Sequence, residues 1–306
     1  MQSNANFLNK HRLVESWYWL DRSRAIRKGR RRVYQLAGLA VLVWRNHNGD
    51  LFALPRYCPH LGADLKLAQI EAKGVRCRLH GWLIQGDGLC RTAADGESDR
   101  QIARFTIEES DGIIWFYPGV PRFNRPELQP DLHRLRFPAR TVRCHPHLVL
   151  PNGLDRMHYE HLHGLKARTQ HPIHAVDANT IALPLHLEMP ERRRLLFGER
   201  RGGTSVRGYF QTIGAGMALA RVDAPLQFYM LFAATPDQHG HARMQTTLYT
   251  YRRRDVPRAV SVMRVFLRQD VRILESMRFR RHLTADDDGL RAYIDLINQL
   301  PVVPVD

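Results

Sequence analysis

Two short segments, each with one cysteine and one histidine, constrain this chain more than any other feature of its sequence. Cys58 and His60 are separated by one residue, Cys77 and His80 by two, and sixteen residues lie between the pairs. The 306-residue chain has four cysteines, so half of them lie here. Thiolate and imidazole groups at such spacing are typical metal ligands, and a chain that gathers them around metal has few ways to fold.

The two pairs are open to three interpretations. A structural zinc site is disfavoured because its ligand pairs usually enclose two to four residues, whereas Cys58 and His60 enclose one. Incidental core residues are disfavoured because four ligands would then fall into tight pairs by chance. In an iron–sulfur cluster, two cysteines can hold one iron and two histidines the other, and the neutral imidazoles raise the reduction potential. This third interpretation, a mild one-electron relay, is favoured.

The segments CPHLGADL and CRLHGW resemble the Rieske [2Fe–2S] signature, Cys-x-His followed by Cys-x-x-His. The resemblance implies that a [2Fe–2S] cluster is held by four ligands, Cys58, His60, Cys77 and His80. A Rieske domain alone would be a non-catalytic electron carrier ending near residue 120. Because this chain continues to residue 306, we expect a second domain with a function of its own.

The segment Pro151–Gly164, PNGLDRMHYEHLHG, is rich in metal-binding side chains. They are three histidines and two carboxylates, Asp155, His158, Glu160, His161 and His163. Non-haem iron(II) commonly takes two histidines and one carboxylate and keeps open positions for oxygen and substrate. The spacing leaves the choice of histidines open. His158 and His161 share one helical face, whereas His158 with His163 requires a bent or widened helix.

A candidate third ligand lies on a long helix expected from about residue 258 to 280. Its apolar stripe at helical spacing consists of Met263, Phe266, Leu267, Leu274 and Met277. Asp270 falls within this stripe, where a carboxylate is costly unless it is paired or binds metal. The alternative is a buried salt bridge to one of the many arginines. Glu275 lies off the stripe and is the weaker candidate.

A second resemblance selects among these residues. The motif N-x-x-D-x-x-H-x-x-x-x-H of Rieske non-haem iron oxygenase α subunits is similar to four positions here, Asn152, Asp155, His158 and His163. QDVRILESM resembles the family's aspartate-bearing helix. The resemblance implies that His158, His163 and Asp270 hold a mononuclear Fe(II), whereas Glu160 and His161 do not. It places Asn152 beside the ligands without a bond to the metal.

Asp155 is expected to carry electrons between the two metal sites. It precedes His158 by one helical turn, so its carboxylate can accept a hydrogen bond from that imidazole. The resemblance implies a head-to-tail homotrimer, in which the same carboxylate reaches a cluster histidine of the neighbouring chain, here His80. The alternative is that Asp155 only caps a helix that begins near Leu154.

The predicted fold class is α+β. Short strand patterns between turn signals run to about Pro118, with VYQLAGLAVLVW expected as one strand before a turn at Asn48–Asp50. A proline-bearing linker, residues 118–138, follows. The resemblance implies an N-terminal all-β Rieske domain over residues 1–121. It implies a C-terminal catalytic domain of helix-grip type over residues 122–306, in which an antiparallel sheet wraps a long helix.

The implied function is that of a terminal oxygenase, with monooxygenation favoured over dioxygenation. O2 is the co-substrate, and NAD(P)H acts only indirectly through a reductase. The chain most resembles the subgroup with α subunits only, which includes ketosteroid hydroxylases, cholesterol desaturase-like enzymes, and vanillate and dicamba demethylases. The expected substrate is a small apolar organic molecule. Oxidative O- or N-demethylation and desaturation remain alternatives, as does a plain electron carrier.

The net charge of +16 suggests an acidic partner. Its basic runs are far apart and contain no nucleic-acid motif, so an acidic ferredoxin or reductase is expected and nucleic acid is not. The longest apolar run, LAGLAVLVW at residues 36–44, is too short to span a bilayer. The first residues lack the apolar stretch of a signal peptide, so the expected location is the cytoplasm.

Overall fold

The computed structural model describes residues 5–92, 96–127, 131–168, 171–189 and 204–303. It divides into an N-terminal unit, Lys10–Asn124 with Pro301–Asp306, and a C-terminal unit, Met1–Asn9 with Arg125–Leu300. This division lies a few residues beyond the expected boundary at 121, and it assigns each chain end to the other unit. Among the described residues, no helix is both long and apolar enough to cross a membrane.

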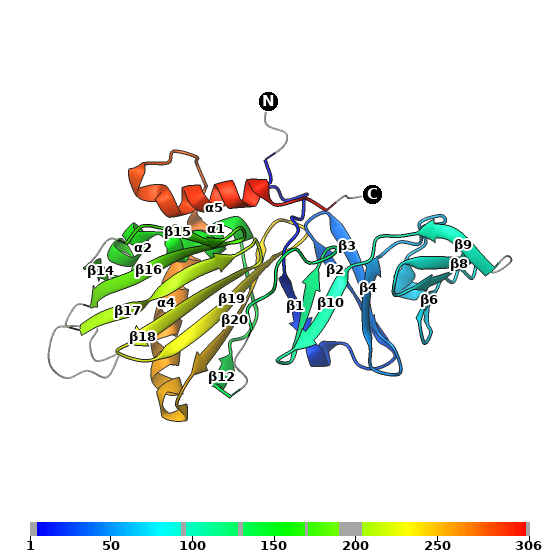
Figure 1. Cartoon of the computed structure of the whole chain (residues 1–306), viewed down its shortest axis with the longest axis horizontal. Coiled ribbons are helices and arrows are strands. Elements are labelled where there is room, and N and C mark those ends of the chain that lie inside the picture. Colours follow the sequence, from blue (N-terminus) through cyan, green and yellow to red (C-terminus); the bar gives the residue numbers. More distant parts are fainter. Residues whose placement is uncertain (1–4, 93–95, 128–130, 169–170, 190–203, 304–306) are drawn as a thin grey trace. The chain divides into compact units, whose positions relative to one another are not determined.

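The N-terminal unit consists of three antiparallel sheets (Figure 1). The first has the order β1 (Tyr18–Arg22), β11 (Ile113–Tyr117), β10 (Thr106–Ser110). The second is β2 (Arg30–Leu36), β3 (Leu39–Arg45), β4 (Leu51–Pro55). The third is β5 (Gln69–Ile70), β6 (Gly74–Arg76), β7 (Leu83–Gln85), β8 (Leu89–Thr92), β9 (Gly96–Gln101). Two 3-10 turns, η1 (Ser23–Ala25) and η2 (Leu65–Leu67), complete the unit.

The expectation that VYQLAGLAVLVW forms one strand is wrong. The chain reverses at Ala37, so that β2 and β3 pair as a hairpin with Leu36 opposite Leu39. Ala37 has φ 50°, in the left-handed region that a two-residue hairpin turn requires. The expected turn at Asn48–Asp50 does separate β3 from β4.

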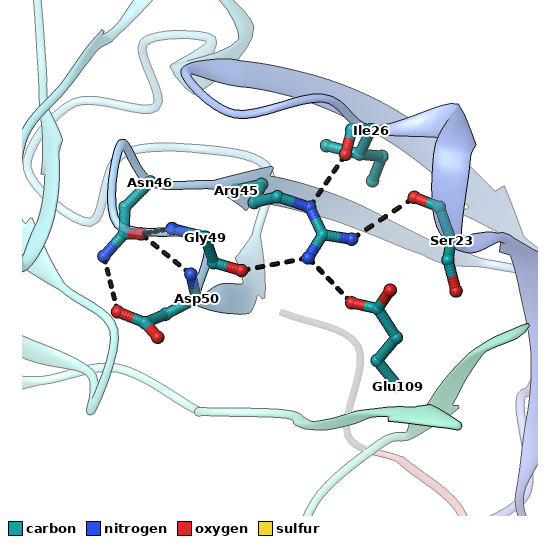
Figure 2. Close-up of polar contacts among 7 residues, drawn as sticks. All are labelled: Ser23, Ile26, Arg45, Asn46, Gly49, Asp50 and Glu109. Carbon is teal, nitrogen blue, oxygen red and sulfur yellow. Dashed lines mark hydrogen bonds and ion pairs between the residues drawn. The ribbon is translucent and has the colours of Figure 1, made fainter. Parts of the chain in front are cut away.

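Arg45, at the end of β3, ties two of these sheets together (Figure 2). Its guanidinium donates to the backbone carbonyls of Ser23, Ile26 and Gly49, and its Nη1 lies 2.7 Å from Oε2 of Glu109 on β10. Neighbouring Asn46 accepts from the amides of Gly49 and Asp50 and so closes the β3–β4 turn. This side chain of Arg45 is mostly buried, so its donors replace water for carbonyls that would otherwise lack partners.

The C-terminal unit contains a nine-stranded antiparallel sheet. Its path is β12 (His133–Arg136), β20 (Ala242–Thr250), β19 (Phe228–Pro236), β18 (Met217–Ala224), β17 (Thr204–Ile213), β16 (Thr180–Met189), β14 (Lys166–Ala167). Two short strands lie off this path: β13 (Arg140–Val142) pairs with β20, and β15 (His174–Asp177) with β16.

The long helix α4 (Val256–Ser276) packs on one face of this sheet (Figure 1). Ala259, Val262 and Met263 join an apolar core with strand residues such as Met230 and Leu248. The other helical segments are α1 (Pro146–Val149), η3 (Leu150–Leu154), α2 (Arg156–His161), η4 (Arg253–Asp255), η5 (Ala285–Asp287) and α5 (Asp288–Gln299). The helix expected over residues 258–280 thus starts and ends earlier, as α4, and the helix expected to begin near Leu154 starts at Arg156, after the 3-10 turn η3.

The buried His147 and the half-buried His145 hold the start of the chain within the C-terminal unit. His145 caps α1 by accepting from the amide of His147, and Nδ1 of His147 accepts from the amide of Leu8. Phe7 stacks on the His147 ring, with centroids 5.8 Å apart. Burial lowers the pKa of His145 to about 4 and that of His147 well below its ordinary value. Both imidazoles are therefore neutral acceptors in the folded protein at neutral pH.

We expect this pair to make the C-terminal unit acid-sensitive. Between pH 6.5 and 4 the unfolded chain protonates at His145 while the folded chain does not, so the free energy of unfolding is unaffected above pH 6.5 and falls below it. His145→Asn keeps a capping acceptor but does not titrate. It should remove about 2 kcal/mol of the stability lost between pH 7 and pH 5, measured by urea unfolding. The exposed control His174→Asn should leave this loss unchanged; an equal loss in both variants would contradict the assignment.

Candidate metal centres

The two cysteine–histidine segments form loops of the same backbone conformation. The first follows β4 and the second joins β6 to β7. In each, the cysteine amide donates to the carbonyl five residues later, Ala63 or Trp82, and a glycine amide donates back to the cysteine carbonyl. Both glycines, Gly62 and Gly81, have φ 72°. The unequal spacings Cys-x-His and Cys-x-x-His therefore sit in loops of equal shape.

The donors of these loops face one another in pairs. The rings of His60 and His80 have centroids 4.7 Å apart. Cys58 and Cys77 are both buried, and burial together with the Cys77 thiol raises the pKa of Cys58 to about 11. Nδ1 of His60 is buried and has no hydrogen-bond partner among the residues that the structure describes. A thiol pair, an imidazole pair and a buried ring nitrogen without a partner are what a metal cluster would satisfy.

These donors do not converge on a single point. Among the described residues, three or more metal-binding side chains place their donor atoms within 4.8 Å of one another only at a different site. A tetrahedral zinc ion needs all four ligand atoms about 2.0–2.3 Å from one centre. The arrangement therefore fits a two-iron cluster better than a single zinc ion.

Arg100 and Trp82 hold the two loops together, and both were missed from the sequence. The Trp82 ring of the second loop stacks on the His60 ring of the first, with centroids 4.7 Å apart and planes at 3°. Arg100 on β9 donates from Nη1 to the carbonyl of Pro59 at 2.9 Å, and its guanidinium lies 6.0 Å from the Trp82 ring centroid. The HGW segment carried a signal for Trp82, whereas no spacing rule points to Arg100.

The separate site of convergent donors consists of His158, His163 and Asp270. Asp270 Oδ1 lies 2.8 Å from His158 Nε2 and 3.1 Å from His163 Nε2. Burial alone would raise the pKa of Asp270, but its contacts with the two histidines outweigh burial and lower it. Two imidazole nitrogens and an ionised carboxylate oxygen match the donor set that non-haem iron prefers.

The local backbone explains how His158 and His163 meet. At the end of α2 the amides of both Leu162 and His163 donate to the His158 carbonyl, at 3.0 and 3.4 Å, so the last turn widens. Gly164 then reverses the chain with φ 64°. His161, on the other side of α2, is exposed. The spacing left the choice between His161 and His163 open and the family motif selected His163; this widened turn brings His163 to the site.

Glu275, the weaker candidate for a third ligand, is engaged elsewhere. Its Oε1 accepts from the amide of Arg143, and its Oε2 lies 3.5 Å from Nη2 of Arg140. Asp270 faces the two histidines one turn earlier on α4.

Asp155 caps α2 within this chain. Its Oδ1 accepts from the backbone amide of His158 at 3.0 Å. The expected hydrogen bond from the His158 imidazole to Asp155 is not formed: His158 Nδ1 is buried and has no partner among the described residues. The first amides of a helix need acceptors, and the carboxylate serves them first. Nδ2 of Asn152 lies 3.1 Å from His158 Nε2, beside the ligand atoms.

An apolar cavity of about 120 Å³ opens onto these three residues. Strands β17 to β19 and helix α4 supply most of its walls, among them Phe210, Ala220, Phe228, Phe232, Met263 and Leu267. The run FYMLFAA at residues 228–234 contributes four residues, Phe228, Phe232, Ala233 and Ala234. Gly153 borders the cavity where a Cβ atom would stand 2.3 Å from the Phe210 ring, so only glycine lets that ring approach.

Comparisons with known proteins agree with these features. Residues 16–105 match the family model of the Rieske [2Fe-2S] domain. The oxygenase component of 3-ketosteroid-9-alpha-monooxygenase from Rhodococcus rhodochrous is 33% identical over 50% of this chain and 44% of its own. The vanillate O-demethylase oxygenase subunit of Pseudomonas sp. (strain ATCC 19151) is 27% identical over 65% of this chain and 60% of its own. The chain thus spans less than two thirds of either relative.

Solved structures share the fold over nearly the whole chain. Dicamba monooxygenase bound to 3,6-dichlorosalicylic acid has a TM-score of 0.68 at 16% identity, covering 96% of this chain and 98% of its own. The oxygenase in the reduced complex with ferredoxin in carbazole 1,9a-dioxygenase has a TM-score of 0.68 at 18% identity, covering 96% and 91%. The predicted fold class, a Rieske domain followed by a helix-grip domain, is confirmed.

We expect Arg100→Gln to lower the reduction potential of a [2Fe–2S] cluster bound between the two loops. The variant removes a cation that favours the added electron and a hydrogen bond that joins the loops. The measurement is a redox titration followed by EPR. Arg91→Gln, an exposed arginine on neighbouring β8, is the matched control. Equal reduction potentials in wild type and Arg100→Gln would show that the charge of Arg100 does not affect the cluster.

Proposed function

We propose that this chain, which carries a Rieske [2Fe–2S] domain and is related to the oxygenase components of Rieske-type oxygenases, is a terminal oxygenase that hydroxylates a small apolar organic substrate with O2. The observation that carries the proposal is the convergence of His158, His163 and Asp270 at one end of an apolar cavity. A plain electron carrier is disfavoured because it needs neither this second site nor the cavity.

In this proposal the residues of the chain divide the work between two sites. A bound [2Fe–2S] cluster supplies one-electron transfer, and a bound mononuclear iron(II) supplies activation of O2. Cys58, His60, Cys77 and His80 would hold the cluster in the paired loops. His158, His163 and Asp270 would hold the iron and leave its other positions free for oxygen and substrate.

The walls of the cavity orient the substrate and exclude water. Their aromatic and aliphatic side chains offer few polar contacts, so an apolar molecule gains most from entering. Gly153 and Phe210 shape the cavity beside Asn152 and His158. An engineered protein cavity of about 150 Å³ holds benzene, so the volume of about 120 Å³ suits a substrate portion of about one ring.

Oxidative demethylation is the second candidate function. Oxygen inserted into a methyl group next to an ether oxygen or amine nitrogen gives a product that collapses with loss of the methyl carbon. The similarity to vanillate O-demethylase supports this outcome, whereas the similarity to 3-ketosteroid-9-alpha-monooxygenase supports plain hydroxylation. Desaturation of the same class of substrate is the third.

The proposed electron donor is an acidic ferredoxin or reductase that is itself reduced by NAD(P)H. The net charge of +16 favours an acidic partner, and a solved relative of the fold is in complex with a ferredoxin. We further propose a cytoplasmic homotrimer, in which Asp155 of one chain faces the cluster loops of the next. His158 Nδ1 is buried without a partner among the described residues, which leaves it available to the Asp155 carboxylate in such a bridge.

Oxygen uptake tests the function. With a surrogate reductase, wild-type protein should consume O2 when one member of a panel of steroids, aromatic methyl ethers and N-methyl amines is added, and mass spectrometry should identify the product. Asp270→Ala should reduce this uptake by at least about 100-fold, because a carboxylate ligand is lost, while the cluster spectrum stays intact. Substrate-dependent O2 uptake at the wild-type rate in Asp270→Ala would show that Asp270 is not a ligand of the catalytic metal.

A separate expectation concerns Asp155→Asn. Asparagine keeps an oxygen that caps α2 but loses the charge needed to bridge two metal sites. Reoxidation of the reduced cluster by O2 and substrate, followed at visible wavelengths in a single turnover, should slow by orders of magnitude while both metals remain bound. Normal turnover in this variant, or an active monomer in solution, would leave Asp155 as a helix cap only.

A further inference from the structure

One turn of helix α4 contacts the His163 ring on three sides. The Phe266 ring stacks on it, with centroids 4.3 Å apart and planes at 23°. Asp270 Oδ1 lies 3.1 Å from its Nε2. Gln269 Oε1 lies 3.1 Å from its Nδ1. Stacking fixes the plane of the imidazole, and the two polar contacts fix its rotation within that plane.

The two ring nitrogens of His163 consequently have different partners. Nε2 faces the carboxylate and His158, so it is the nitrogen that belongs to the convergent donor group. A nitrogen that binds metal must be unprotonated, which places the ring proton on Nδ1. Nδ1–H then needs an acceptor, and the side-chain oxygen of Gln269 is at hydrogen-bond distance.

Among the described residues, α4 offers His158 no acceptor comparable to Gln269 for its second ring nitrogen. Its Nε2 faces Asp270, but its Nδ1 is buried with no partner within the described part of the chain. His158 lies in the first turn of α2, which Asp155 caps, and Nδ2 of Asn152 is 3.1 Å from its Nε2. Within the described residues, His163 therefore has an acceptor for its second ring nitrogen, and His158 does not.

We propose that Gln269 is a positioning residue that sets the tautomer and orientation of His163 and thereby the metal affinity of the site. The inference deepens the proposed function and rests on it. Acceptors for the outer nitrogen of a metal-binding histidine typically change metal affinity by about 10–100-fold. Because Gln269 directly precedes Asp270, a single helical turn would supply both a metal ligand and the acceptor that orients another.

The side chain at 269 is neutral, and this has a chemical consequence. Two neutral imidazoles and one carboxylate leave a divalent ion with one net positive charge. A glutamate at 269 would keep the acceptor and add a negative charge, which makes the His163 imidazole a stronger donor to metal. A leucine would keep the volume and remove the acceptor. The pair Gln269→Leu and Gln269→Glu therefore separates hydrogen bonding from packing.

Cobalt binding tests the proposal without reference to turnover. Cluster-loaded protein is freed of mononuclear metal by a chelator and dialysed against buffered Co(II), and bound cobalt is counted by atomic absorption while cluster iron is counted separately. Wild type should bind one cobalt per chain. Gln269→Leu should raise the Kd about 10–100-fold. Gln269→Glu should bind at least as tightly as wild type, and the exposed control Arg268→Gln should not change the Kd.

Each of the other possible outcomes would contradict one specific part of the proposal. If wild type binds no cobalt in place of the chelated metal, the mononuclear site itself fails, and with it the proposed function. If wild type binds cobalt and Gln269→Leu binds it equally well, only the role of Gln269 fails. Equal weakening in Gln269→Leu and Gln269→Glu would mean packing rather than hydrogen bonding. Should Gln269→Leu not fold, Gln269→Asn, which keeps the amide but is one methylene shorter, decides by the same comparison.

Discussion

The carboxylate of Asp270 is the constraint around which the C-terminal unit is organised. It lies on the apolar side of α4, where an isolated charge would be too costly to bury. His158 and His163 offset this cost by meeting both sides of the same oxygen. A 3-10 turn, a capped short helix and a widened last turn all serve to bring these two imidazoles from α2 to α4. Their removal would leave a buried, unpaired anion.

The N-terminal unit solves a different problem, the pairing of two distant loops. Its loops have equal backbone conformations, although their histidines follow the cysteines at different spacings. These two loops place the Cys58 thiol beside the Cys77 thiol and the His60 ring beside the His80 ring, an arrangement that suits two metal ions rather than one. Trp82 and Arg100 add contacts between the loops that do not depend on metal. The loops are thus held together from outside as well as by what they bind.

The cavity shows how the same sheet serves both stability and function. Along β18, Ala218, Ala220 and Val222 lie on the strand face that borders the cavity, and small residues there leave room that larger ones on β19 and α4 partly fill. The side chains that close the core near α4, such as Met263 and Phe266, also line the cavity. Under the proposed function, core packing would therefore limit which substrate shapes the cavity accepts, because the same side chains build the core and line the cavity.

The sequence by itself predicted the four candidate cluster ligands as a set, the apolar helix face that carries Asp270, and, through family resemblance, the α+β architecture. These follow from local spacing and helical periodicity, which short-range geometry controls. The hairpin at Ala37, the widened turn that brings His163 to the site, and the contact of Asp155 with a helix amide rather than with the His158 imidazole depended on how hydrogen bonds were distributed in three dimensions. The family motif had already selected His163 over His161, but it did not show how the backbone achieves this. Arg100 reached the cluster loops only through packing between separate elements, which no spacing rule along the chain encodes. Trp82 and Gln269 lie next to motif residues in the sequence, but their contacts with His60 and His163 appeared only in three dimensions.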